Sequence, residues 1–128
     1  MRVHYLAFVY ALSAGVALSA DAPTSYTEAS VVWSSSKDMS EYHQYAQEFA
    51  QFNNRFRLDS RAGCYQVGSG PVNLMLVITH TAPSQFALIE RVYSDSQSER
   101  ARCFIESYQG LRTKIPPFVP FVLQMRMQ

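Results

Sequence analysis

The sequence predicts a single α+β domain in which a three-stranded antiparallel sheet packs with two helices. Three observations predict this class. Aromatic residues recur at helical spacing between 42 and 56, apolar residues alternate in segments that begin near 72, 87 and 121, and a second helical pattern lies between the last two segments. The expected order is helix, strand, strand, helix, strand, with the helices packed on one face of the sheet.

Residues 1–20 carry the features of a secretory signal peptide. One positive side chain, Arg2, precedes the apolar run YLAFVYALSAGVALSA, which ends in small residues and leads into a polar segment. We expect cleavage near Ser19 to Ala22. The alternative is an uncleaved membrane anchor, although the run is slightly short for a spanning helix of about 20 apolar residues. Cleavage predicts a periplasmic or secreted protein with no membrane attachment afterwards.

The rest of the chain is long enough for one domain with a single modest core. Segment 21–37 is rich in Ser and Thr, so we expect a flexible leader there, followed by the domain at 38–128. The formal net charge of +1 gives no electrostatic basis for binding nucleic acid or an acidic membrane, because both require a concentrated positive surface.

The chain contains two cysteines, Cys64 and Cys103. An even number of cysteines in a small exported domain usually forms bridges, so we expect one disulfide between them. A reactive thiol is the first alternative, because Arg100 and Arg102 can lower the pKa of a thiol at Cys103, but no histidine is close in sequence. A metal site is the second, but the cysteines and the scattered histidines lack ligand spacing, so no metal is expected.

The first helix is predicted within the segment SKDMSEYHQYAQEFAQFNNRFRLD. Its aromatic residues recur at steps of three and four, which places them on one face of a helix. Ser36, Asp38 or Ser40 can cap its start. A stripe of this kind is typical of a packing surface and not of a cofactor site. It consists of Tyr42, Tyr45, Phe49, Phe52 and Phe56.

An antiparallel hairpin is predicted after the glycine-rich turn at 63–71, because the loop HTAPSQ is short. The first strand, VNLMLVIT, turns one fully apolar face to the core. Met75 and Val77 make its second face partly apolar, so we expect this strand to be central and covered on part of both sides. The strand faces are Val72, Leu74, Leu76 and Ile78 in the first strand, and Leu88, Glu90 and Val92 against Ala87, Ile89, Arg91 and Tyr93 in the second.

The second helix and the last strand complete the pattern. Ser94, Asp95 or Ser96 can cap the helix and Gly110 can end it. The prolines of KIPPFVP exclude a helix and limit ladder donors, so the last strand is expected to begin near Phe121. The expected faces are Ala101, Phe104, Ile105, Tyr108 and Leu111 in the helix, and Phe121, Leu123, Met125 and Met127 against Val122, Gln124 and Arg126 in the strand.

No set of residues predicts catalysis or a cofactor. His80 is expected near the hairpin turn, beside Glu90 or Asp95, but a general base needs a nucleophile within hydrogen-bond reach and none is recognisable. The glycines at 63, 68 and 70 precede a strand instead of a helix, and no lysine follows them as in a phosphate loop. We therefore expect binding and not catalysis.

The order of these segments resembles the periplasmic C-terminal domains of the TonB and TolA proteins. PVNLMLVIT resembles the first strand of that family, and IERVYSDSQSERARCFIESYQGLRTKIPPF resembles its second strand, helix and proline-bearing exit. The TolA branch is closer, because YAQEFAQFNNRF, a cysteine before the hairpin, a cysteine in the following helix and KIPP are similar to its arrangement. The hairpin lacks the common Asp-Gly turn. The leader, with a reach of at most roughly 55 Å, replaces a long spacer.

The resemblance implies that the last strand lies at a sheet edge and accepts an extended peptide by strand addition. The expected partner is an envelope protein or a peptide segment of one. The alternative is a small secreted inhibitor or immunity-type protein that blocks an enzyme or toxin. The implied binding residues are Phe121, Val122, Leu123, Gln124, Met125 and Arg126.

Overall fold

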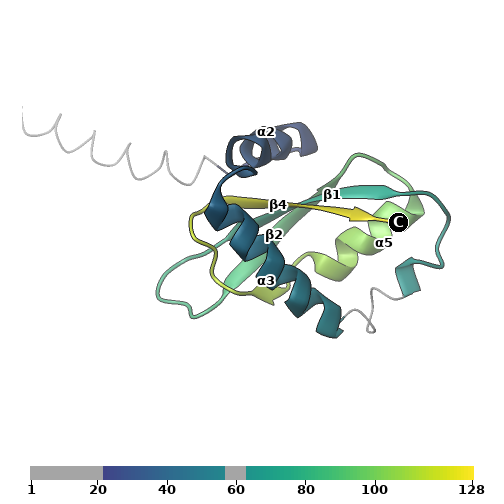
Figure 1. The fold of residues 1–128 in the computed structure, drawn as a ribbon. Helices are drawn as coiled ribbons and strands as arrows, with labels where there is room; N and C mark the ends of the chain where they lie inside the picture. The colour runs from purple at the N-terminus through teal and green to yellow at the C-terminus, as the bar shows by residue number, and fades with distance from the viewer. Residues whose placement is uncertain (1–21, 57–62) are drawn as a thin grey trace, which may run out of the picture.

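The computed structural model describes residues 22–56 and 63–128, and Figure 1 shows their α+β fold. A four-stranded sheet with the strand order β3-β2-β1-β4 forms its centre, and all its pairings are antiparallel. The predicted class is confirmed. The predicted number of three strands is wrong because β3 adds a fourth, and the element order gains a helix and a strand. The elements are α2 (Tyr26–Ser36), α3 (Ser40–Phe56), β1 (Val72–Thr79), β2 (Ala87–Ser94), α5 (Glu99–Tyr108), β3 (Arg112–Thr113) and β4 (Phe121–Met127).

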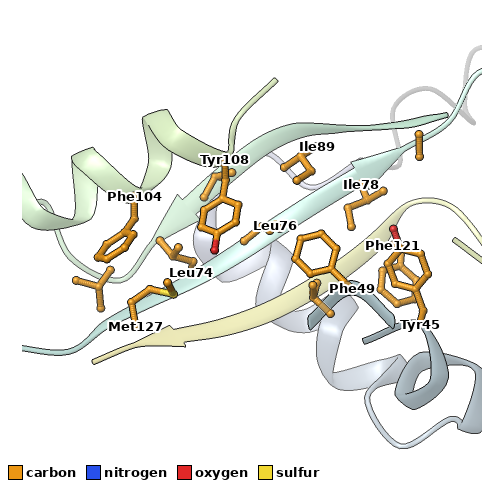
Figure 2. Close-up of a cluster of buried hydrophobic side chains, with 14 of the residues drawn as sticks. Tyr45, Phe49, Leu74, Leu76, Ile78, Ile89, Phe104, Tyr108, Phe121 and Met127 are labelled. Atoms are coloured by element: carbon orange, nitrogen blue, oxygen red, sulfur yellow. The ribbon is translucent and has the colours of Figure 1, made fainter. Parts of the chain in front are cut away.

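Helices cover both faces of the sheet. The larger core lies between one face and the helices α3 and α5, where Tyr45, Phe104 and Tyr108 meet the apolar side of β1 (Figure 2). The smaller core lies on the opposite face, where Ala29 of α2 packs with Met75, Val77 and Val122. The two predicted helices, α3 and α5, therefore share one face as expected, and α2, which was not predicted, covers the opposite face. The central position of β1, with apolar cover on both sides, is confirmed.

Segment 21–37, expected to be a flexible leader, contains α2. Ser25 caps the helix by accepting a hydrogen bond from the Glu28 N–H at 3.1 Å. The Glu28 carboxylate accepts from the Thr24 N–H at 2.8 Å and from its hydroxyl at 2.9 Å, which holds the pKa of Glu28 below its ordinary value. Ala29 is fully buried against the sheet. Local capping and tertiary burial together order this serine-rich segment.

A bulge in β2 changes which side chains reach the larger core. Val77 faces Arg91, whereas Ile78 faces Ile89, so Glu90 is the extra residue. Strict alternation is therefore wrong beyond this point: Val92 joins Ile89 in the larger core instead of sharing a face with Glu90. β4 has no such shift in its pairing with β1, and its predicted alternation is confirmed.

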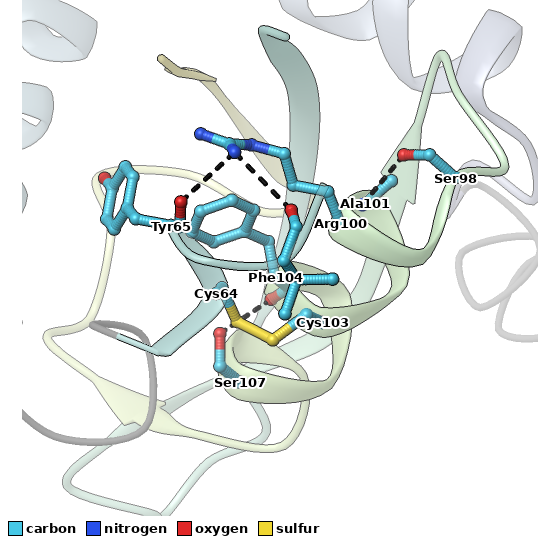
Figure 3. The surroundings of a disulfide bond; sticks show 9 residues. Cys64, Tyr65, Ser98, Arg100, Ala101, Cys103, Phe104 and Ser107 are labelled. Carbon is cyan, nitrogen blue, oxygen red and sulfur yellow. Dashed lines mark hydrogen bonds between the residues drawn. A yellow bond between two sulfur atoms is a disulfide. The ribbon is translucent and has the colours of Figure 1, made fainter. Parts of the chain in front are cut away.

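The Cys64–Cys103 disulfide is present, with the two Cα atoms 5.5 Å apart (Figure 3). It joins the turn before β1 to α5. The cap of α5 is Ser98 and not one of the three residues expected, and Ser98 accepts from the Ala101 N–H at 3.1 Å. Gly110, with φ of 92°, follows the end of the helix as expected.

Arg100 is a second tie between the same parts of the chain. Its side chain is only 5 % exposed although it carries a charge. The guanidinium donates to the carbonyl oxygens of Tyr65 at 3.3 Å, Val67 at 3.5 Å and Gly68 at 3.2 Å, and to the carbonyl oxygen of Gln128 at 2.7 Å. One side chain thus joins α5, the segment before β1 and the end of β4. From the sequence, Arg100 was considered only as a residue that lowers the pKa of a reactive thiol. The disulfide leaves no free thiol for that role.

We predict that Cys64→Ser lowers the free energy of unfolding by about 4 kcal/mol, because the bridge closes a long loop, with a sequence separation of 39 residues. Thermal unfolding of the oxidised chain measures this loss. Reductant should bring the wild-type midpoint down to that of the variant and leave the variant unchanged. Equal midpoints for the wild type with and without reductant would contradict a stabilising bridge.

Arg100→Ala should destabilise the fold by about 3 kcal/mol, because it removes charge-assisted hydrogen bonds to four carbonyl groups and opens a cavity. Urea unfolding measures the change. Arg102→Ala is the matched control, because Arg102 is exposed on the same helix, and its effect should stay within about 0.5 kcal/mol. Equal urea midpoints for Arg100→Ala and Arg102→Ala would show that Arg100 does not anchor the fold.

Candidate functional site

β4 lies at one edge of the sheet, because its only sheet partner in the described structure is β1. The side chains of Phe121, Val122 and Leu123 are buried in the two cores. Gln124 and Arg126 are exposed and Met125 is half-buried. Of the residues predicted to bind a partner, only the last three therefore present side chains at the surface.

The outer main-chain groups of β4 can be assigned from one hydrogen bond. The Gln124 N–H points away from β1 and donates to the Tyr42 hydroxyl oxygen of α3 at 3.3 Å. In an antiparallel pair, alternate residues direct both main-chain groups to the same side. The N–H and C=O groups of Arg126 therefore also point outward, and those of Met125 point to β1.

Tyr42 is held in place from the other side of the sheet. Its hydroxyl accepts from the Trp33 indole N–H of α2 at 2.9 Å, and its ring stacks on Phe121 with the centroids 5.3 Å apart. The pair Trp33 and Tyr42 thus occupies the middle of the edge. A partner strand has room to pair only beyond Gln124, toward the end of β4.

A groove of about 240 Å³ lies beside this free part of the edge. Ala46, Phe49 and Ala50 of α3 form one wall, and residues 123–126 of β4 form the other. The two alanines leave space where larger side chains would fill the groove. The Arg126 guanidinium donates at 3.2 Å to the side-chain oxygen of Asn73, its partner residue on β1, so it reaches across to the neighbouring strand. Main-chain donors and acceptors and a partly apolar groove therefore lie together, as strand addition requires.

β3 forms the opposite edge and is held by α3. The Tyr45 hydroxyl donates to the Lys114 carbonyl oxygen at 2.7 Å, and burial raises the pKa of Tyr45 above its ordinary value. The Lys114 ammonium binds the Glu48 carboxylate at 2.6 Å. The hydrogen bond from Lys114 is the main reason that the pKa of Glu48 lies below its ordinary value.

The residues considered for catalysis are not assembled into a site. His80 bonds to the Ser84 carbonyl oxygen at 2.7 Å inside the hairpin loop. Asp95 lies at the other end of the hairpin, where it accepts from the Asn73 side chain at 2.8 Å. Glu90 is the bulge residue and makes no hydrogen bond to His80 in the described part of the chain. Within residues 22–56 and 63–128, no three His, Cys, Asp or Glu side chains are grouped to hold a metal ion.

The disulfide is consistent with an oxidising compartment. The predicted signal peptide at 1–20 lies outside the described residues. Among the helices that the structure describes, none has the length and apolar character needed to cross a membrane.

No family model matches this chain, and comparison with curated proteins and with solved structures found no significant match. The resemblance to the TonB and TolA domains therefore stays a hypothesis.

The ion pair at β3 predicts an acid-dependent contribution to stability. Because the folded-state pKa of Glu48 is lowered, the contribution is present above the ordinary value of 4.5 and is lost as pH falls through the lower folded-state pKa. Glu48→Gln should therefore be less stable than the wild type near pH 7, and the difference should shrink as the pH falls below 4.5. Urea unfolding at several pH values measures it. A difference that stays constant with pH would contradict this role of Glu48.

Proposed function

We propose that this chain is an exported, non-enzymatic interaction domain that binds an extended segment of an envelope protein by strand addition to β4. The observation that carries the proposal is the position of β4 at the sheet edge, with outward main-chain groups beyond Gln124. The groove next to residues 123–126 supports it, because partner side chains need space beside the pairing strand. The proposed contacts narrow to Gln124, Met125 and Arg126.

The geometry also limits the length of the paired segment. The Tyr42 hydroxyl already binds the Gln124 N–H, so a partner strand finds the Gln124 carbonyl and both main-chain groups of Arg126. So few main-chain bonds give modest affinity. Side-chain contacts in the groove, formed with Phe49 and Met125, must supply the rest.

One observation favours the second candidate, an inhibitor or immunity-type protein. Tyr65 is 47 % exposed although its segment is fixed by the neighbouring disulfide and by the bond from Arg100 to its own carbonyl oxygen. A rigid segment that presents an aromatic side chain loses little entropy on binding, which suits a blocking surface. The identity of the captured partner separates the two candidates: a transport or envelope-integrity protein supports the first, and a hydrolase or toxin supports the second.

The strand-addition proposal predicts that Arg126→Pro weakens partner binding without unfolding the domain. Proline removes the outward N–H of Arg126 but no hydrogen bond to β1. Arg126→Ala is the matched control, because it loses the same side chain and keeps the N–H. We expect binding of a partner captured from envelope extract to be at least about tenfold weaker in Arg126→Pro than in Arg126→Ala.

Hydrogen exchange of the complex provides a direct check. The main-chain amide of Arg126 should gain protection when the partner binds, because it enters a new ladder. Equal affinities of the two variants, with no protection at Arg126, would exclude strand addition at β4.

A further inference from the structure

Large apolar side chains gather at the opposite edge of the sheet, around β3. They come from α3, from the hairpin loop, from β2 and from the chain on both sides of β3. Each is more than a third exposed, which is unusual for a cluster of this size on a small domain. They are Phe52 at 42 %, Phe86 at 51 %, Leu88 at 41 %, Leu111 at 38 % and Ile115 at 40 %.

Two hollows lie within this cluster. The larger has a volume of about 530 Å³ between Phe52, Phe86 and Ile115. The smaller has a volume of about 260 Å³ and lies toward the hairpin loop, with His80 and Ser84 in its wall. Phe86 and Arg112 border both hollows, so this pair forms the ridge between an apolar pocket and a more polar one.

The charge at this ridge is positive. No carboxylate lines either hollow. The Lys114 ammonium is neutralised by Glu48, but Arg112 is exposed, and among the described residues no carboxylate lies within ion-pair distance of it. Its guanidinium lies 5.8 Å from the centre of the Phe86 ring, which holds it over the cluster. A guanidinium presented in this way matches a carboxylate through two parallel hydrogen bonds.

The main chain of Arg112 also faces outward. The Ile89 N–H donates to the Leu111 carbonyl oxygen at 2.9 Å, so the carbonyl group of Leu111 points to β2. Antiparallel alternation then turns both main-chain groups of Arg112 away from the sheet. An extended ligand lying on this edge can therefore bind main-chain groups, one cation and an apolar pocket at the same time.

We propose that the β3 edge is a second docking site, which binds an extended acidic peptide segment of a partner protein. The peptide places an apolar side chain between Phe52 and Ile115 and an aspartate or glutamate on Arg112. This site is independent of the proposed site on β4, because the two strands lie at opposite edges of the sheet.

Selection from a random peptide library on the intact oxidised protein tests this site. We expect the selected peptides to combine an aromatic or branched aliphatic residue with a nearby Asp or Glu. Their binding, measured by fluorescence anisotropy, should be at least tenfold weaker for Arg112→Glu and for Phe86→Ser. The matched controls are Arg102→Glu, a charge reversal on α5, and Val31→Ser, which removes a side chain that is 66 % exposed on α2. Both controls should stay within twofold of the wild type.

The same selection on Arg112→Glu should enrich Lys and Arg in place of Asp and Glu. Selected peptides without acidic residues, or with equal affinity for Arg112→Glu and the wild type, would overturn the proposal. Dimerisation that Arg112→Glu abolishes would overturn it as well, because a second copy would then be the occupant. Arg126→Pro should leave the binding of these peptides unchanged. The test of the β3 site is therefore separate from the test of the β4 site.

Discussion

The joint anchoring of α5 by the Cys64–Cys103 bridge and by Arg100 is the constraint on which the rest of the fold depends. The bridge lowers the entropy of the unfolded chain. The guanidinium donates hydrogen bonds to carbonyl groups of two segments that are far apart in sequence. A buried charge is costly unless its hydrogen bonds are satisfied, and the Arg100 Nε atom has no partner among the described residues. The anchor therefore costs desolvation, and it fixes where β1 begins and where β4 ends.

Because β1 is paired on both sides and covered on both faces, the open edges of the described sheet are β4 on one side and, on the other, β3 together with the part of β2 that the two-residue β3 leaves unpaired. The two edges are protected in different ways. At β4 the Tyr42 hydroxyl occupies one outward amide. β3 is short, carries the cationic side chain of Arg112 and is tied to α3 through Tyr45. The protection is partial at both edges, so each edge keeps an accessible surface: a groove at β4 lined by Phe49, Met125 and Arg126, and an apolar surface around Arg112 at β3.

Local patterns predicted the parts of the fold that depend on neighbouring residues. Alternation in β1 and β4 and the pairing of two cysteines needed no knowledge of distant contacts. The bulge at Glu90 depends on the register between two strands, and the hydrogen bond from Gln124 to Tyr42 joins residues 82 positions apart. The spacing of Ser25 and Glu28 was a local signal for the start of α2. The many serines of this segment made its apolar side, where Ala29 packs on the sheet, difficult to recognise from the sequence. The edge position of β4 was predicted from the family resemblance. The hydrogen bond from the Gln124 N–H to Tyr42 and the exposed apolar cluster at β3 were not predicted.

The burial of β1 on every side has a consequence for the chain before it folds. Val72–Thr79 contains no charged residue and no proline, and it is rich in residues that favour extended structure. Segments of this composition stack into cross-β aggregates when they are exposed. Folding shields them only after strands on both flanks have paired with β1, and β4 follows β2, α5 and β3 in the described order of elements. During synthesis more than 40 further residues must therefore be added before β4 can pair with this segment. A chaperone that binds the unpaired segment in that interval would protect it from self-association.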